Sequence, residues 1–261
     1  AQFIGRVDQE LHDFDMTIMY GRQSRTISKS KRYMHAVSFA GYAHFRGGSY
    51  YRANELLLEA RELIKRSKGA RAVNSALLSF VNSKSGDLIS GKTFLRRAIK
   101  SRSAMAANSH YWHSDAWASF SSLVNLAHGT YLNSHGNHSE AEVYLRAAVK
   151  EWGPYRNDQS LSSYSDVPHG YLRQYQTITS ELTLNLVNQE RPYEAEVLQR
   201  QVTLEVIQAF GLYSNVTADA LTALALTLST QAKYKDARVL LEYVTNIWLS
   251  VGAEDTATKL L

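Results

Sequence analysis

The stretch from Glu190 to Leu261 repeats a helical pattern, and this repeat limits the possible folds more than any other feature of the chain. Ala195 and Ala237 lie 42 residues apart. Around each, a helical segment, a short polar turn with an aromatic residue and a second helical segment follow one another. Periods of about 20–50 residues are typical of solenoids in which each unit packs on its neighbours. The sequence therefore predicts an all-α solenoid of paired helices.

The same plan recurs earlier in the chain, each time with a small residue near the start of the second helix. These small residues are Ala53, Gly91 and Ala141, and each follows a break that is rich in glycine and serine. Glycine ends a helix at little cost because it tolerates a positive φ. From Ala53 through Ala237 the spacings are 38, 50, 54 and 42 residues. The uneven spacing indicates insertions between the helical hairpins.

The pattern divides the chain into four segments. We expect a capping helix in 1–30, degenerate hairpins in 31–152, an inserted polar loop in 153–175, and the best-formed repeats in 176–261, the last of them incomplete. The insertion is rich in Ser, Asp, Asn and Tyr between Gly153 and Gly170. Long loops of this composition act either as spacers or as contact surfaces for a partner.

Several motifs resemble the tetratricopeptide repeat (TPR). Gly48-x-Tyr50-x-x-Ala53 and Tyr234-x-x-Ala237 have its spacing, with apolar residues four and seven positions later. The 42-residue period and Ala195-Glu196-Val197-Leu198 resemble more specifically the kinesin-light-chain type of this repeat. The resemblance covers 31–151 and 176–261, and it departs at Gly91, where alanine is usual. It implies a right-handed superhelical solenoid of antiparallel helix pairs that binds a peptide or protein on its concave side.

Alignment of the hairpins on their small residues predicts which side chains face this concave side. The predicted peptide-binding groove contains His35, Tyr42, Arg46, Phe80, Lys84, Thr130, Asn133, Thr177, Ser180, Asn188, Asp219, Thr222 and Ser229. We expect amide and hydroxyl groups to hold a peptide backbone, with Arg46 and Lys84 pairing with a carboxylate. The paired Lys and Asn of chaperone-binding members of the family are not reproduced, so that partner is not expected.

Three functional hypotheses follow. The main one is a non-catalytic scaffold that binds a protein or peptide, which can be another part of the same polypeptide. The second is the regulatory arm of a larger protein, for example one with the CHAT caspase-like protease domain that often follows repeats of this type, because Thr256 onward resembles the opening of a further hairpin. The third is a nucleotide-binding protein.

The third hypothesis rests on Gly86-Asp87-Leu88-Ile89-Ser90-Gly91-Lys92-Thr93, a full match to the G-x-x-x-x-G-K-[ST] phosphate-binding loop. In such a loop Lys92 contacts the terminal phosphates and Thr93 holds magnesium. The loop needs a parallel sheet around it, and the sequence offers no convincing second strand. Gly91, by contrast, already has a place in the helical repeat. We therefore interpret the motif as a hairpin turn and expect no cofactor.

Two histidine pairs are candidates for metal binding. His110 and His113, and likewise His135 and His138, are three residues apart, a spacing that can hold zinc together with a carboxylate such as Asp115. Neither pair has the His-Glu-x-x-His form, and the second straddles a predicted turn. We interpret these histidines as surface or capping residues, and we expect neither a metal site nor catalytic residues.

Composition limits the remaining possibilities. The 261 residues include no cysteine, which excludes disulfides and thiolate sites within the chain, and no apolar run approaches the ~18 residues that span a membrane. The net charge of +5 comes largely from early clusters, which we interpret as solvated helix faces, with a nucleic-acid or acidic-membrane footprint as the alternative. The clusters are Arg22, Arg25, Lys29, Lys31, Arg32, then Arg61, Lys65, Arg66, Lys68, Arg71, then Arg96, Arg97, Lys100 and Arg102. We expect no nucleic-acid partner.

The numbering opens at Ala1 without an initiator methionine. This start is typical of a chain whose signal peptide has been removed, or of a trimmed one. A periplasmic or secreted location is thus the expectation, with a cytoplasmic location as the alternative.

Overall fold

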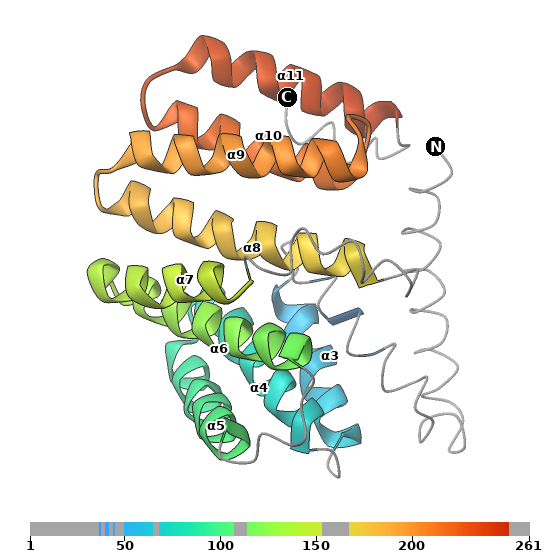
Figure 1. Ribbon diagram of the computed structural model, residues 1–261, viewed down its shortest axis with the longest axis vertical. Coiled ribbons are helices and arrows are strands. Elements are labelled where there is room, and N and C mark those ends of the chain that lie inside the picture. Colours follow the sequence, from blue (N-terminus) through green and yellow to red (C-terminus); the bar gives the residue numbers. More distant parts are fainter. Residues whose placement is uncertain are drawn as a thin grey trace. The chain divides into compact units, whose positions relative to one another are not determined.

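The computed structural model describes residues 37, 40, 41, 44, 50–64, 68–106, 114–152 and 167–250. Within these ranges the chain forms helices and turns and no strand (Figure 1). The helices are α3 (Tyr50–Leu63), α4 (Lys68–Lys84), α5 (Leu88–Ala106), α6 (Ser114–Ser134), α7 (His138–Trp152), α8 (Val167–Asn188), α9 (Pro192–Phe210), α10 (Asn215–Ser229) and α11 (Tyr234–Ser250). The prediction of an all-α fold built from antiparallel helix pairs is confirmed. The predicted capping helix and the chain after Ser250 lie outside the described residues.

The described helices belong to two compact units that divide between Glu151 and Trp152. The N-terminal unit contains α3 to α7, and the C-terminal unit contains α8 to α11. In the N-terminal unit α4 packs against α3, α5 and α6. In the C-terminal unit α9 lies against α8 and α10, and α10 also packs against α11. Each unit thus buries its first helices among several neighbours. None of the described helices has the length and hydropathy needed to cross a bilayer.

Every second helix begins in the same register. The small residue is the fourth residue of α3, α5, α7, α9 and α11, and in each it is buried. These residues are Ala53, Gly91, Ala141, Ala195 and Ala237. A small side chain at this position lets the second helix approach the first closely, which is why the sequence repeats it.

Two glycines in first helices make an equally close approach. A Cβ on Gly129 would lie 2.6 Å from Cγ of Leu145, and one on Gly41 would lie 3.0 Å from Cγ of Leu57. Each glycine stands twelve residues before the small residue of its hairpin. At these positions even one methyl group would force a leucine of the facing helix to move.

Gly91 departs from the usual alanine for a local reason. A Cβ on Gly91 would lie 2.7 Å from Oγ of Ser83, and Ser79 Oγ donates a hydrogen bond to the Gly91 carbonyl at 3.0 Å. The Ser83 side chain of α4 therefore occupies the space that a methyl group fills in the other hairpins. The glycine is an adaptation to these serines.

The hairpin turns share one backbone conformation. The residue five positions before the small residue has a positive φ, at 87° for Gly86, 79° for Gly136, 60° for Glu190 and 58° for Ala232. In the last three turns the following N–H donates to the carbonyl five residues earlier, which satisfies a helix-terminal acceptor. The two described hairpin turns of the N-terminal unit thus have glycine at this position, whereas those of the C-terminal unit have glutamate and alanine.

The predicted polar loop of 153–175 is shorter on its C-terminal side than the sequence indicates. Helix α8 already begins at Val167, so the residues from there to 175 are helical. Pro168 does not prevent this, because a proline in the first helical turn lacks an N–H that would have no partner there in any case. Residues 153–166 lie outside the described residues.

Candidate peptide-binding face

Three of the predicted groove residues that the structure describes in the N-terminal unit are buried. Phe80 and Thr130 are each 1% exposed and Asn133 is 9% exposed. The prediction of a groove contact is wrong at these three positions, because the packing of neighbouring helices covers them. Lys84 is half-buried at the end of α4. The predicted groove residues His35, Tyr42 and Arg46 lie outside the described residues.

In the C-terminal unit the predicted residues lie on α8 (Val167–Asn188) and α10 (Asn215–Ser229). Helices α8 and α10 pack on one another. Thr177 and Asp219 hold equivalent positions 42 residues apart, as do Ser180 and Thr222. All four are half-buried or exposed. Side chains with oxygen acceptors therefore occupy the same two repeat positions on two neighbouring helices.

Asn188 and Ser229 lie near the ends of these helices. Asn188 is exposed and follows Thr177 and Ser180 by eleven and eight residues, which puts the three on one side of α8. Ser229 is half-buried and its Oγ donates to the Ala225 carbonyl at 3.0 Å. It is seven residues after Thr222, so by helical periodicity it points to the same side of α10 as Thr222. Asn188 and Ser229 therefore both belong to the row.

The sequence analysis missed two leucines at the centre of this surface. Leu184 is 42% exposed and Leu226 is 61% exposed, and they follow Ser180 and Thr222 by four residues each. Residues four apart on a helix lie on one face. The signal was present in the sequence, because the leucines are themselves 42 residues apart. The sequence pattern alone does not distinguish these exposed leucines from the buried leucines beside them.

We call this surface the α8–α10 face. It consists of Thr177, Ser180, Leu184, Asn188, Asp219, Thr222, Leu226, Ser229 and Thr230. Thr222 Oγ1 donates to the Ala218 carbonyl at 2.8 Å, so its oxygen is left to accept a hydrogen bond from a ligand. Asp219 carries the one charge of the face. Such a surface suits a peptide that offers backbone N–H groups and apolar side chains.

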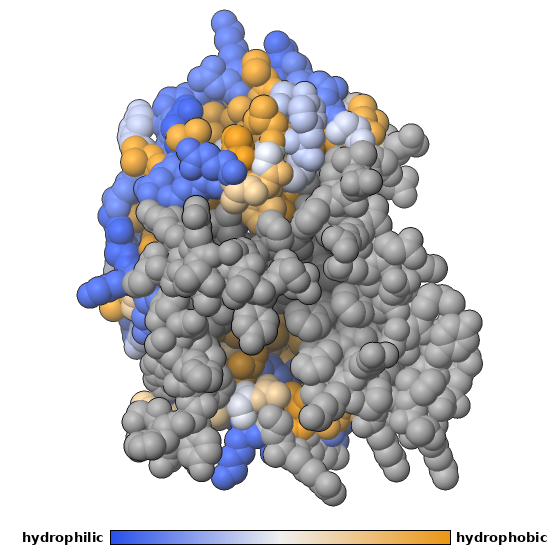
Figure 2. Space-filling view, turned by 45° about the vertical axis from the view of Figure 1, so that its right-hand side comes forward, coloured by the Kyte–Doolittle hydropathy of each residue, from blue (hydrophilic) through white to orange (hydrophobic). Residues whose placement is uncertain are grey.

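Other hydrophobic side chains are exposed in the same unit. Tyr193, Val197 and Leu204 line one side of α9, and Tyr234 and Val239 lie on α11. Figure 2 shows hydrophobic residues interspersed with hydrophilic ones on the surface around α11. These residues belong to second helices, so they form a surface separate from the α8–α10 face.

The phosphate-loop motif forms a hairpin turn, as the sequence analysis predicts. Gly86 takes the positive φ of the turn, and Asp87 Oδ1 accepts a hydrogen bond from the Ser90 N–H at 3.0 Å. Hydrogen bonds from Ser90 hold the pKa of Asp87 below its usual value. Lys92 is exposed on α5, and Thr93 Oγ1 donates to the Ile89 carbonyl at 3.0 Å. The motif is thus the cap and first turn of a helix.

The histidine pair at the α6–α7 turn makes local hydrogen-bond contacts. His138 Nδ1 lies 2.6 Å from Asn133 Oδ1, and His135 Nδ1 lies 3.0 Å from the Tyr131 carbonyl oxygen. His110 and His113 are outside the described residues. The described ranges contain no cluster of three His, Asp or Glu side chains with metal-binding geometry.

Comparison with known proteins identifies the fold. No protein-family model and no curated protein matches the chain. It is similar to the solved structure of kinesin light chain TPR-like repeats from Podosopora anserina, with 16% identity and a TM-score of 0.50 over 84% of this chain and 96% of that one. BtubC (BKLC) from P. vanneervenii matches with 14% identity and a TM-score of 0.48 over 82% and 86% of the two chains. PilF from Pseudomonas aeruginosa matches with 15% identity and a TM-score of 0.43 over 87% and 88%. The first likeness shows that this chain has the TPR-like helical repeat fold.

Proposed function

We propose that this protein is a protein- or peptide-binding scaffold whose α8–α10 face holds an extended segment of a partner. The observation that carries the proposal is the pair of exposed leucines, Leu184 and Leu226, at equivalent positions of two adjacent first helices. Helical repeats of this fold generally act as non-catalytic surfaces for protein interaction. Exposed leucines at one repeat position favour a binding role because these helices bury their other described leucines. The buried ones are Leu182, Leu186, Leu221, Leu224 and Leu228.

The polar residues around the leucines determine what kind of segment fits. Thr177 and Ser180 precede Leu184 on α8, and Asp219 and Thr222 precede Leu226 on α10. Their oxygen atoms can accept hydrogen bonds from a peptide backbone, while the leucines contact apolar side chains. With Asp219 as its single charge, the face favours a neutral or weakly basic segment. The partner can be another protein or another part of the same polypeptide.

Selection from a random peptide library tests the proposal with an unidentified partner. Phage-displayed peptides are selected on the wild-type protein, and the selected peptides are then measured by fluorescence anisotropy against two double variants. Leu184→Ala with Leu226→Ala should weaken binding about tenfold, because contact leucines at an interface centre contribute about 1–2 kcal/mol together. The matched control, Leu204→Ala with Leu249→Ala, removes two exposed leucines from second helices of the same unit.

The control decides the outcome. If both double variants bind the selected peptides as wild type does, the α8–α10 face is not the binding site. If only the control loses affinity, the outer surface of α9 and α11 is the site and the proposal is wrong.

A further inference from the structure

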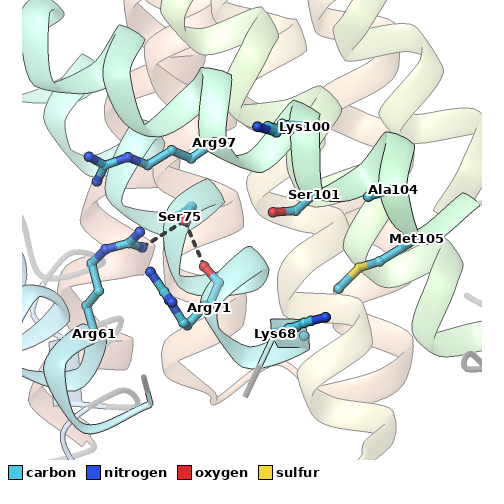
Figure 3. Close-up of a pocket in the computed structure, with 10 residues that line it drawn as sticks. Arg61, Lys68, Arg71, Ser75, Arg97, Lys100, Ser101, Ala104 and Met105 are labelled. Carbon is cyan, nitrogen blue, oxygen red and sulfur yellow. Dashed lines mark hydrogen bonds between the residues drawn. The ribbon is translucent and has the colours of Figure 1, made fainter. Parts of the chain in front are cut away.

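An open pocket of about 1220 Å³ lies in the N-terminal unit, among α3, α4 and α5. Of the ten described residues that line it, five are basic and none is acidic. The lining consists of Arg61, Lys68, Gly69, Arg71, Ser75, Arg97, Lys100, Ser101, Ala104 and Met105 (Figure 3). The sequence analysis interprets these charges as solvated helix faces. The tertiary structure instead gathers basic residues from three helices around one space.

Two arginines of the pocket, Arg61 and Arg97, contact neutral groups. Arg61 Nη1 donates to Ser75 Oγ at 2.8 Å, and that hydroxyl donates to the Arg71 carbonyl at 2.7 Å. The guanidinium carbons of Arg61 and Arg97 lie 5.4 and 5.3 Å from the centre of the Phe94 ring. A serine and an aromatic ring thus position two of the guanidinium groups without neutralising them.

The positive charges are close enough to repel one another. Burial lowers the pKa of Arg61, and the charges of Arg97 and Arg71 lower it further. Glu62 has the opposite and weaker effect. In Figure 3 the side chains of Arg61, Arg71 and Arg97 lie on one side of the pocket, with Ser101, Ala104 and Met105 on the other. A bound anion would relieve this repulsion.

We propose that this pocket binds a small anion that carries two or three linked phosphates. Each guanidinium presents a planar fork of N–H donors that matches phosphate oxygens, and the two lysines add point charges. A terminal phosphoryl group carries up to about two negative charges, so linked phosphates complement a pocket with several basic residues better than a single carboxylate does. The pocket volume of about 1220 Å³ is somewhat above the range of about 300–1,000 Å³ that is usual for small-molecule sites, so the pocket has room for an anion with linked phosphates.

This site is independent of the proposed peptide-binding function. It lies in the other unit, and Arg71 is nine residues before Phe80, a difference of about 180° around α4. Arg71 and the pocket are therefore on one side of α4, and the predicted groove residue Phe80 is on the opposite side. Loss of peptide binding and loss of phosphate binding are separate results.

Isothermal titration calorimetry with inorganic triphosphate at low ionic strength tests the proposal. The pocket variant is Arg97→Gln with Lys100→Gln, and the matched control is Lys92→Gln with Arg96→Gln. All four residues are exposed on α5, and the control residues do not line the pocket. Both variants remove two charges from the same helix, so they change its stability and the net charge alike. Circular dichroism verifies that both fold.

We expect the wild type to bind triphosphate, the pocket variant to bind about tenfold more weakly, and the control to differ by less than about twofold. No binding by the wild type overturns the proposal. Equal losses in both variants also overturn it, because they indicate diffuse surface charge. A loss confined to the control would instead assign binding to the Gly86–Thr93 motif, since Lys92 belongs to that motif.

A second arm distinguishes phosphate from carboxylate chemistry. Citrate and a hexaglutamate peptide are titrated under the same conditions as triphosphate. We expect both to bind the wild type more weakly than triphosphate. Tighter binding of the hexaglutamate peptide, lost in the pocket variant, would identify a site for an acidic protein segment and contradict the phosphate proposal.

Discussion

At one repeat position, the described side chains are buried in the N-terminal unit and exposed in the C-terminal unit. Eleven residues before the small residue of the second helix, the N-terminal unit has Phe80 and Thr130, and both are buried. The C-terminal unit has Leu184 and Leu226 at this position, and both are exposed. The register of a helical repeat therefore determines the direction of a side chain within its hairpin. Whether neighbouring elements cover that side chain depends on the unit.

The hairpin turns differ in a second way. Gly86 and Gly136 take the left-handed conformation in the N-terminal unit, whereas Glu190 and Ala232 take it in the C-terminal unit. An L-residue in this conformation costs roughly 1–2 kcal/mol relative to the right-handed one. The C-terminal unit thus has the same turn geometry although its turn residues are strained. We infer that packing of the flanking helices determines the turn.

The largest effect should come from truncation at the shared repeat position. Phe80→Ala should lower the free energy of unfolding of the N-terminal unit by about 3–5 kcal/mol, because it leaves a cavity in the core. Leu226→Ala should change the stability of the C-terminal unit by less than about 0.5 kcal/mol, because the leucine is exposed. Urea denaturation, with hydrogen exchange to assign each unit, measures both. Equal losses would show that the position has the same environment in both units.

The stability of the two units should also respond differently to acid. Glu196 accepts hydrogen bonds from Lys233 Nζ at 2.7 Å, Gln231 Nε2 at 2.8 Å and Arg200 Nε at 2.8 Å. The Lys233 hydrogen bond is the main cause that lowers the pKa of Glu196 to about 2. The stability from this carboxylate is present above the ordinary pKa of 4.5 and is lost as the pH falls toward about 2.

The pKa of Glu151 in the N-terminal unit is shifted in the opposite direction, upward. Burial raises its pKa, although Ser121 and Asn125 donate hydrogen bonds to it at 3.1 and 3.0 Å. The folded unit therefore prefers the protonated acid, and the stability from this group is lost as the pH rises through the raised pKa. As the pH falls from neutral, Glu151 should stabilise its unit before protonation of Glu196 destabilises the other.

Lys233→Met tests the acid contrast. It should lower the stability of the C-terminal unit at pH 7 by about 1–2 kcal/mol and flatten its loss between pH 4.5 and 2. The lower end of this range reflects solvent screening, because the Lys233 side chain is 37% exposed. Hydrogen exchange at several pH values gives the stability of each unit. An unchanged acid profile would mean that Lys233 does not control the Glu196 titration.

A smaller effect on stability is expected at the position twelve residues before the small residue, where the two helices of a hairpin are in close contact. Gly129→Ala should destabilise the N-terminal unit by about 1–2 kcal/mol, because the new methyl group would overlap Leu145. At the equivalent position of the C-terminal unit, Ala225→Gly should destabilise by about 1 kcal/mol through lost helix propensity. Thermal denaturation measures both. If Gly129→Ala raised the stability, helix propensity alone would decide this position.

The smallest effect is expected at the turns. Ala232→Gly should stabilise the C-terminal unit by about 0.5–1 kcal/mol, because glycine removes the strain at a φ of 58°. Gly86→Ala should destabilise the N-terminal unit by a similar amount, since it introduces the same strain at a φ of 87°. A shift of the urea midpoint in the same direction for both variants would contradict this account.

The sequence by itself determined the paired helices, the register of the small residues and the hairpin turn at Gly86–Thr93. These features depend on helical periodicity and on glycine backbone chemistry, which act over a few neighbouring residues. The predicted loop failed at its C-terminal side because polar composition cannot show that Pro168 stands in a helical first turn, where it is tolerated.

The tertiary structure alone decided which surfaces are open. Phe80 is buried and Leu226 is exposed at the same repeat position, and Arg61, Arg71 and Arg97 converge although they are up to 36 residues apart in the chain. Burial and convergence depend on contacts between residues that are distant in sequence. Local pattern gives the direction of each side chain within its helix, but only the packing of other helices sets what that side chain meets.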